Sequence, residues 1–218
     1  MIKNTLEGAS NAWVAFVDVY GFTQLLRDSK GNLVDLHRRI EQAQKASQVR
    51  FEKKGVKYFP FSDNLFIAVP TTGSNNADAL ELLLSAVREA IDKHIVQDLP
   101  LRGGIAFGPV SFSSGLLVGE PVIRAVEYEK SVGLPMVILP EYETSVCADI
   151  HGLIKKFIKI PYPASSSRPG ILSVCTIIPK RPHGYVEYAN RRMEQFSING
   201  PPHVAFAWQE VVKLIGQN

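Results

Sequence analysis

Apolar and polar residues alternate along the chain in patterns that predict a series of strands and helices. The apolar run Trp13–Val19, rich in β-branched and aromatic residues, has the composition of a buried strand. Over Phe22–Lys54, apolar residues recur at helical spacing between charged ones, which predicts one long helix or two helices broken near Gly31. A second helical pattern covers about Asn75–Gln97.

Shorter apolar segments complete this pattern. Val56–Phe61 and Leu65–Val69 are typical of the two strands of a hairpin. The pattern then predicts a strand at Leu101–Phe107, a helix at about Pro121–Val132 and a strand at Pro135–Leu139. The order contains β-α-β-β-α-β, the split βαβ or ferredoxin-like plan of α+β domains, in which an antiparallel sheet has its helices on one face. The other face needs a cover, and a partner subunit is one candidate.

The last third of the chain is less regular. The pattern predicts two strands separated by a Ser-rich loop and then two short helices, at Ile154–Ile160, Ile171–Ile178, Val186–Phe196 and Val204–Ile215. The final helix has too much apolar surface to remain in solvent, so we expect it to pack on the main sheet. We therefore divide the chain into a core of residues 1–150 and a C-terminal extension of residues 151–218 on the same domain.

Composition is that of a soluble globular protein. Of the 218 residues, 45% are hydrophobic and 21% are charged, and the net charge of +3 is too small and scattered to indicate nucleic-acid binding. The N-terminus lacks the apolar core of a signal peptide, and no apolar run is long enough to cross a membrane. Cys147 and Cys175 lack metal-site spacing and are typical of reduced thiols. These features predict a cytoplasmic protein without a membrane or nucleic-acid partner.

Two aspartates are candidates for chemistry. Asp18 interrupts the first apolar strand just before a turn at Gly21 and a helix, where helix amides can bind phosphate and a carboxylate can hold Mg²⁺. Asp63 lies in the hairpin turn, next to that strand in a ferredoxin-like sheet. Two facing carboxylates repel each other, and divalent ions that relieve the repulsion would clamp a triphosphate. The alternatives are that Asp18 caps the helix and that Asp63 is an ordinary turn residue.

The segment Phe16–Thr23, FVDVYGFT, resembles the first motif of the class III nucleotidyl cyclases, an apolar strand followed by Asp and then Gly-Phe-Thr or Gly-Phe-Ser. Asp63 matches their second metal-binding Asp, although Ser62 stands where the family usually has Gly. The resemblance covers roughly residues 12–140, and implies a ferredoxin-like class III cyclase domain that works as a homodimer. It also implies two Mg²⁺ or Mn²⁺ ions per site, held by Asp18, Asp63 and the carbonyl of Val19.

The base-reading half of the family's site is altered here. Phe59 and Leu116 align with the purine-selecting residues, and Ile123 and Glu127 align with the catalytic Asn and Arg. Three explanations compete: an inactive cyclase-like nucleotide-binding or scaffold protein, a misalignment that brings Arg124 into the site, or a cyclase for another base. An adenylate or guanylate cyclase with a divergent base pocket is a further alternative.

The third explanation is favoured by FPFSD at Phe59–Asp63 and AVEYE at Ala125–Glu129. Both are similar to the Pycsar pyrimidine cyclases of bacterial anti-phage defence. That resemblance implies conversion of UTP, or of CTP, to the 3′,5′-cyclic nucleotide and pyrophosphate, with UTP favoured.

The resemblance also assigns roles to individual residues. It places the outer phosphates against the amides of Tyr20, Gly21, Phe22 and Thr23, and the base near Phe59 unless that ring only fills the core. The family's missing arginine leaves a charge to be supplied, from this chain or its partner. The candidates are Arg102, Arg124, Lys57 and Arg50, each of which is otherwise a surface charge.

Overall fold

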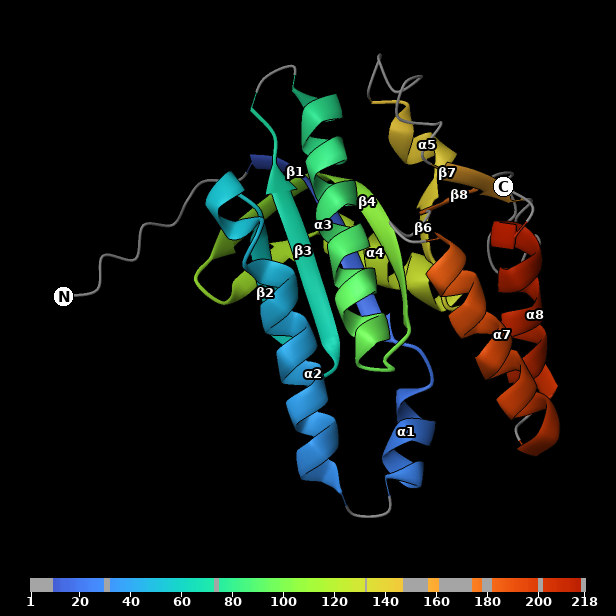
Figure 1. Ribbon diagram of the computed structural model, residues 1–218. Coiled ribbons are helices and arrows are strands. Elements are labelled where there is room, and N and C mark those ends of the chain that lie inside the picture. The colour runs from blue at the N-terminus through green and yellow to red at the C-terminus, as the bar shows by residue number, and fades with distance from the viewer. Residues whose placement is uncertain are drawn as a thin grey trace.

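Figure 1 shows a computed structural model of the chain, which describes residues 10–29, 32–72, 75–131, 133–146, 157–160, 174–177, 182–199 and 202–216. The described strands form one eight-stranded sheet in the order β2-β3-β1-β4-β6-β8-β7, with β5 paired to β4. The strands are β1 (Ser10–Val19), β2 (Lys57–Phe61), β3 (Asn64–Pro70), β4 (Leu101–Ser113), β5 (Leu116–Gly119), β6 (Val137–Pro140), β7 (Phe157–Ile160) and β8 (Val174–Ile177). The described helices are α1 (Phe22–Asp28), α2 (Leu33–Gln48), α3 (Asn76–Val96), α4 (Glu120–Ser131), α5 (Glu141–Thr144), α7 (Pro182–Asn199) and α8 (Pro202–Gly216), with a 3₁₀ turn at Glu52–Lys54.

Strand β1 lies in the middle of the sheet because its side chains are apolar on both faces. It pairs antiparallel with β3 and with β4, while β6 joins β4 in parallel. The segment Ala12–Val17 is buried throughout. The β-α-β-β-α-β order predicted from the sequence is therefore present, with β1 flanked by the strands expected of a ferredoxin-like plan.

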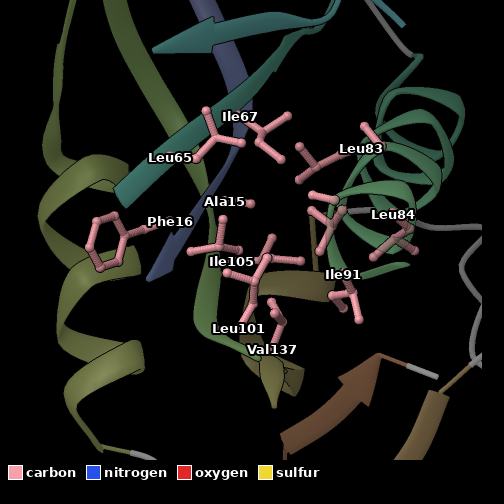
Figure 2. Close-up of a cluster of buried hydrophobic side chains, with 14 of the residues drawn as sticks. Ala15, Phe16, Leu65, Ile67, Leu83, Leu84, Ile91, Leu101, Ile105 and Val137 are labelled. Carbon is pink, nitrogen blue, oxygen red and sulfur yellow. The ribbon is translucent and has the colours of Figure 1, made fainter. Parts of the chain in front are cut away.

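Helices α2 and α3 cover one face of this sheet. Figure 2 shows Ala15, Ile67 and Ile105 on the side of the sheet that faces Leu83 and Ile91 of α3. These residues belong to the main hydrophobic core. The prediction that both helices of the ferredoxin-like unit share one face is thus correct.

Helix α4 covers part of the opposite face, which the sequence had suggested was bare. Phe16 points toward this helix in Figure 2, on the face opposite Ala15. Gly104 pairs with Phe16 across the strands, and a Cβ at Gly104 would lie 2.5 Å from both the Ala125 carbonyl oxygen and the Tyr128 Cβ. Only glycine therefore lets α4 approach β4 this closely. Beyond α4 the same face holds a second buried cluster, made of Ala12, Val14, Ala68, Val110 and Phe112.

The long helical pattern after β1 forms two helices rather than one. Helix α1 ends at Asp28, and α2 begins after Asn32, whose side chain accepts a hydrogen bond from the Asp35 amide (3.2 Å). The polar side chain of Asn32 satisfies an amide that has no partner within the first turn of α2, which explains where that helix begins.

The C-terminal helices pack on the core, where we expected the final helix. Trp208 and Val211 of α8 are fully buried in the main hydrophobic core, and α7 contributes Tyr185 and Tyr188. Both helices are longer than predicted. The division at residue 150, the Ser-rich loop and Cys147 lie outside the described residues. Within the described ranges, no helix has the length and apolar content required to cross a membrane.

The buried histidine His94 of α3 makes stability depend on pH. Its Nδ1 lies 2.7 Å from the Ala90 carbonyl oxygen, and burial lowers its pKa to about 4, although this hydrogen bond acts in the opposite direction. The unfolded chain binds this proton near pH 6.5 and the folded chain only near pH 4. We therefore expect the free energy of unfolding to fall by about 3 kcal/mol as the pH drops through that window. Urea titrations at pH 7 and pH 4 should show a smaller drop for His94→Gln. An equal drop in both proteins would contradict this assignment.

Candidate active site

The end of β1 turns sharply into α1. Gly21 adopts a left-handed conformation (φ 77°), which glycine enters without steric strain, and α1 begins at the next residue. No side chain caps the start of α1, so the alternative that Asp18 is a helix cap is wrong. The Tyr20 amide donates to the Pro100 carbonyl oxygen (2.7 Å). It is thus occupied, and the amides of Gly21, Phe22 and Thr23 remain as the predicted phosphate-binding groups of this turn.

The structure brings Asp18 and Asp63 together. Asp63 follows Ser62, which has a positive φ of 58°, in the turn between β2 and β3. Such a conformation favours glycine, which gives a physical reason for the glycine found there in the family that the sequence resembles. Burial raises the pKa of Asp18 to about 7, and hydrogen bonding and repulsion from Asp63 add to that rise. The two carboxyl groups therefore share one small volume at the ends of adjacent strands.

Arg102 is fixed beside this pair. It stands opposite Asp18 in the β1–β4 register, and its Nη2 lies 3.1 Å from Asp18 Oδ2. Its Nε forms an ion pair with Glu129 of α4, which is only 3% exposed. Burial raises the pKa of the Glu129 carboxyl, and Arg102 opposes that rise. Arg102 thus bridges the partly buried Asp18 and the buried Glu129, and its positive charge compensates the negative charge of both carboxylates.

The other basic candidates lie elsewhere. Arg124 contacts Glu143 (2.9 Å) and Glu120 (2.8 Å) and donates to the Phe107 carbonyl oxygen. Because Phe107 stands five positions beyond Arg102 on β4, this cluster is about 17 Å from the aspartate pair along the strand.

Lys57, Arg50 and Phe59 are also separate from the aspartate pair. Lys57 lies over the Phe112 ring, with 5.9 Å from Nζ to the ring centre, and Arg50 pairs with Glu89 at 3.6 Å. Phe59 packs against the second apolar cluster. None of these three candidates lines the cleft around the aspartates.

A cleft of about 740 Å³ opens at the aspartate pair. This volume lies within the range of small-molecule sites. One wall is the segment Asp18–Leu25 with Asp63 and Arg102, and the other wall comes from α7 and α8. The lining residues of α7 and α8, which the sequence analysis missed, are Arg192, Gln195, Phe196, His203, Val204 and Trp208. They lie far from Asp18 in the sequence, and the helical pattern indicated only that their helices were amphipathic. Asp98, in the turn after α3, also lines the cleft and was missed.

The aspartate pair has the chemistry of a Mg²⁺ or Mn²⁺ site. Carboxylate and carbonyl oxygens are the ligands these ions prefer, and a cation would offset the repulsion that raises the pKa of Asp18. Over the described ranges, no group of three or more His, Cys, Asp or Glu side chains is placed to hold a metal. The assignment of Asp18, Asp63 and the Val19 carbonyl as the metal donors stays a prediction from the sequence.

Solved structures similar to this one are cyclase domains. The adenylyl cyclase CyaB from P. aeruginosa matches 80% of this chain and 96% of its own, with 16% identity and a TM-score of 0.58. The guanylate cyclase domain of RhGC from Catenaria anguillulae, in complex with GTP, matches 78% of this chain and 97% of its own, with 17% identity and the same TM-score. The chain has the fold of a class III cyclase domain. No family model and no curated protein matches the sequence.

The cyclase fold confirms the predicted fold class, an antiparallel-rich ferredoxin-like sheet with helices. A third similar structure is a class III adenylyl cyclase-like ATP-binding protein from Pseudomonas aeruginosa, with 11% identity and a TM-score of 0.53. It matches 67% of this chain and 36% of its own length. The cyclase fold thus also occurs in a protein that is described as binding ATP.

Proposed function

We propose that this protein is a nucleotidyl cyclase that converts UTP, or CTP, to the 3′,5′-cyclic nucleotide and pyrophosphate. The observation that carries the proposal is the pair Asp18 and Asp63, which meet at a nucleotide-sized cleft beside the β1–α1 turn. A structural role alone would not favour this pair, because burial and the neighbouring Asp63 raise the pKa of the partly buried Asp18. In the family that the sequence resembles, this pair holds the metal ions.

In the proposed reaction, the substrate's 3′-hydroxyl oxygen bonds to the α-phosphorus, and the bond from that phosphorus to pyrophosphate breaks. The hydroxyl proton is released to solvent. Asp18, Asp63 and the Val19 carbonyl would hold two Mg²⁺ or Mn²⁺ ions, which offset phosphate charge and lower the pKa of the hydroxyl. The amides of Gly21, Phe22 and Thr23 would orient the outer phosphates. Arg102 would keep Asp18 in place through its second contact with Glu129.

The preference for a pyrimidine rests on the residues at the base-reading positions. Phe59 packs against the cluster of Ala68, Val110 and Phe112, so an apolar ring stands at the position that would read a purine edge. We expect UTP or CTP to be cyclised at least about ten-fold faster than ATP or GTP. The similarity to Pycsar cyclases further suggests that the product is a second messenger in anti-phage defence.

Incubation with each of the four nucleotides and Mn²⁺, followed by separation of cyclic product and pyrophosphate, tests this preference. Cyclic AMP or cyclic GMP as the main product would show the base assignment to be wrong. Binding of nucleotides with no cyclic product from any of them would favour the alternative of an inactive nucleotide-binding protein. Asp63→Ala, assayed in parallel, reports whether any product comes from this site.

A homodimer is part of the proposal. The sheet face beside α4 carries the second apolar cluster, over which Phe59, Leu117 and Val122 are only partly buried. Phe61, at the end of β2, is 74% exposed. A second copy of the chain that covers this face would bury these side chains. It would also bring the base-facing strand and α4 of one chain to the aspartate pair of the other.

A further inference from the structure

A nucleoside triphosphate in the cleft would need cations beside its phosphates. The three arginines that line the cleft in the described part of the chain differ in burial and in their contacts. Among the described lining residues, Arg102 is already shared by Asp18 and Glu129, and Arg27 lies exposed on α1. The remaining arginine is Arg192 of α7, whose side chain is only 11% exposed. Arg192 therefore presents a largely desolvated positive charge in the wall opposite the β1–α1 turn.

Arg192 has spare hydrogen-bonding capacity. Its Nη1 lies 3.6 Å from Asp98 Oδ2 and donates to Gln195 Oε1 at 3.0 Å. Its Nε is buried and has no hydrogen-bond partner among the described residues. Asp98 is half exposed and also lies 3.9 Å from Arg39. A buried donor without an acceptor costs free energy, so an anion that accepts from Arg192 would bind favourably.

Aromatic contacts fix Arg192 relative to the β1–α1 turn. The Tyr20 ring in the turn meets Trp208 of α8 edge-on at 6.1 Å, and Trp208 meets Tyr188 of α7 at 5.6 Å. The Arg192 guanidinium lies 5.8 Å from the Tyr188 ring centre and 5.2 Å from that of Phe196. The guanidinium is thus pre-positioned, which limits the entropy lost when it binds a ligand.

We propose that Arg192 binds the terminal phosphates of the nucleoside triphosphate, in the same chain that carries Asp18 and Asp63. The C-terminal extension then completes the phosphate end of the site. The planar guanidinium matches phosphate oxygens and supplies a positive charge to a site in which Glu127 aligns with the family's arginine. The inference deepens the proposed function and rests on it for the nucleotide, but phosphate binding itself can be measured without turnover.

Inorganic tripolyphosphate with Mn²⁺ is the probe, and its dissociation constant is measured by calorimetry on the full chain. We expect Arg192→Gln to weaken binding at least ten-fold and Arg192→Lys to restore part of the loss. Arg191→Gln is the matched control: Arg191 is the adjacent arginine on α7, is exposed and does not line the cleft. It should bind like wild type.

A second variant separates phosphate binding from a structural ion pair. Asp98→Asn removes the acidic partner of Arg192 but keeps the cation, so we expect tripolyphosphate to bind as tightly as in wild type or more tightly. A structural role would make Asp98→Asn and Arg192→Gln weaken binding alike. Thermal unfolding without ligand identifies any variant that fails to fold. If Arg192→Gln does fail, the lysine and Asp98 variants decide the question.

The outcomes also separate this inference from the proposed function. Loss of tripolyphosphate binding in Arg192→Gln supports the inference even if no nucleotide is cyclised. Unchanged tripolyphosphate binding and an unchanged KM in a folded Arg192→Gln protein that cyclises nucleotides would overturn the inference and leave the cyclase intact. A wild-type chain without measurable affinity for tripolyphosphate and Mn²⁺ would overturn it as well.

Discussion

Replacing Asp63 or Asp18 by alanine is expected to lower nucleotide cyclisation by at least about 10³-fold, because each variant would lose a charged oxygen donor of the proposed metal site. The measurement is cyclic product formed from UTP and CTP over a range of Mn²⁺ concentrations. Very high Mn²⁺ should recover little of the lost rate, since no neighbouring side chain in the described ranges completes a group of three metal ligands.

The fold should survive these substitutions. Because burial and Asp63 raise the pKa of Asp18 to about 7, the ionised form of Asp18 destabilises the metal-free protein above that pH. We therefore expect Asp18→Ala to have a Tm at pH 8, without divalent ions, no lower than that of wild type. Asp78→Asn is the matched control, since Asp78 is an exposed aspartate in the first turn of α3 and does not line the cleft. It should keep wild-type turnover, and near wild-type turnover in Asp18→Ala or Asp63→Ala would refute the metal assignment.

The residues around Asp18 and Asp63 could be placed from the sequence because local signals determine them. A strand that is apolar on both faces belongs in the middle of a sheet, and a hairpin next in the ferredoxin-like order pairs with it. In this arrangement Asp18, at the end of β1, lies next to Asp63, in the turn before β3. The approximate positions of α2, α3 and α4 also followed from their apolar periodicity.

The second wall of the cleft could not be predicted in this way. Periodicity shows that a helix has an apolar face, but it does not show which face of the sheet that helix covers. Helix α4 lies opposite α3 because Gly104 allows close approach, which is a contact between distant segments. Arg192 is positioned at the cleft by its contact with Tyr188, which in turn packs on Trp208 of α8. These residues lie in the last third of the chain, where the sequence pattern is least regular.

Arg124 illustrates the same limit for a charged residue. From the sequence it was one of four basic side chains that could supply the charge of the family's missing arginine. In the structure, Glu143 accepts hydrogen bonds from Arg124, from the Tyr128 hydroxyl and from the Phe107 amide. Glu143 is buried and its one negative charge requires such partners, so Arg124 stabilises the packing of α4 beside β4.

Mixing two separately inactive variants is expected to restore activity to about a quarter of the wild-type level. The first is Asp18→Ala, which lacks a metal donor. The second is Ile123→Glu on α4, where Ile123 is 62% exposed and lies outside the cleft of its own chain. If α4 of one chain completes the site of the other, a mixed dimer has one site with both defects and one with neither. Random exchange makes half of the dimers mixed, each with one intact site of two, which gives about a quarter.

The control for this exchange is Val34→Glu, an equivalent change at an 80% exposed apolar residue of α2, away from the sheet face beside α4. Alone it should keep wild-type activity, whereas Ile123→Glu alone should be inactive. Light scattering must show that each variant is dimeric, and mass spectrometry of differently labelled chains must show that they exchange. Because the two defects lie on opposite sides of one shared site, a mixture that exchanges and stays inactive is incompatible with that arrangement. A fully active monomer would also contradict the shared site. One chain would then supply the whole site, and α7 with Arg192 would take the role that we assign to α4 of the partner.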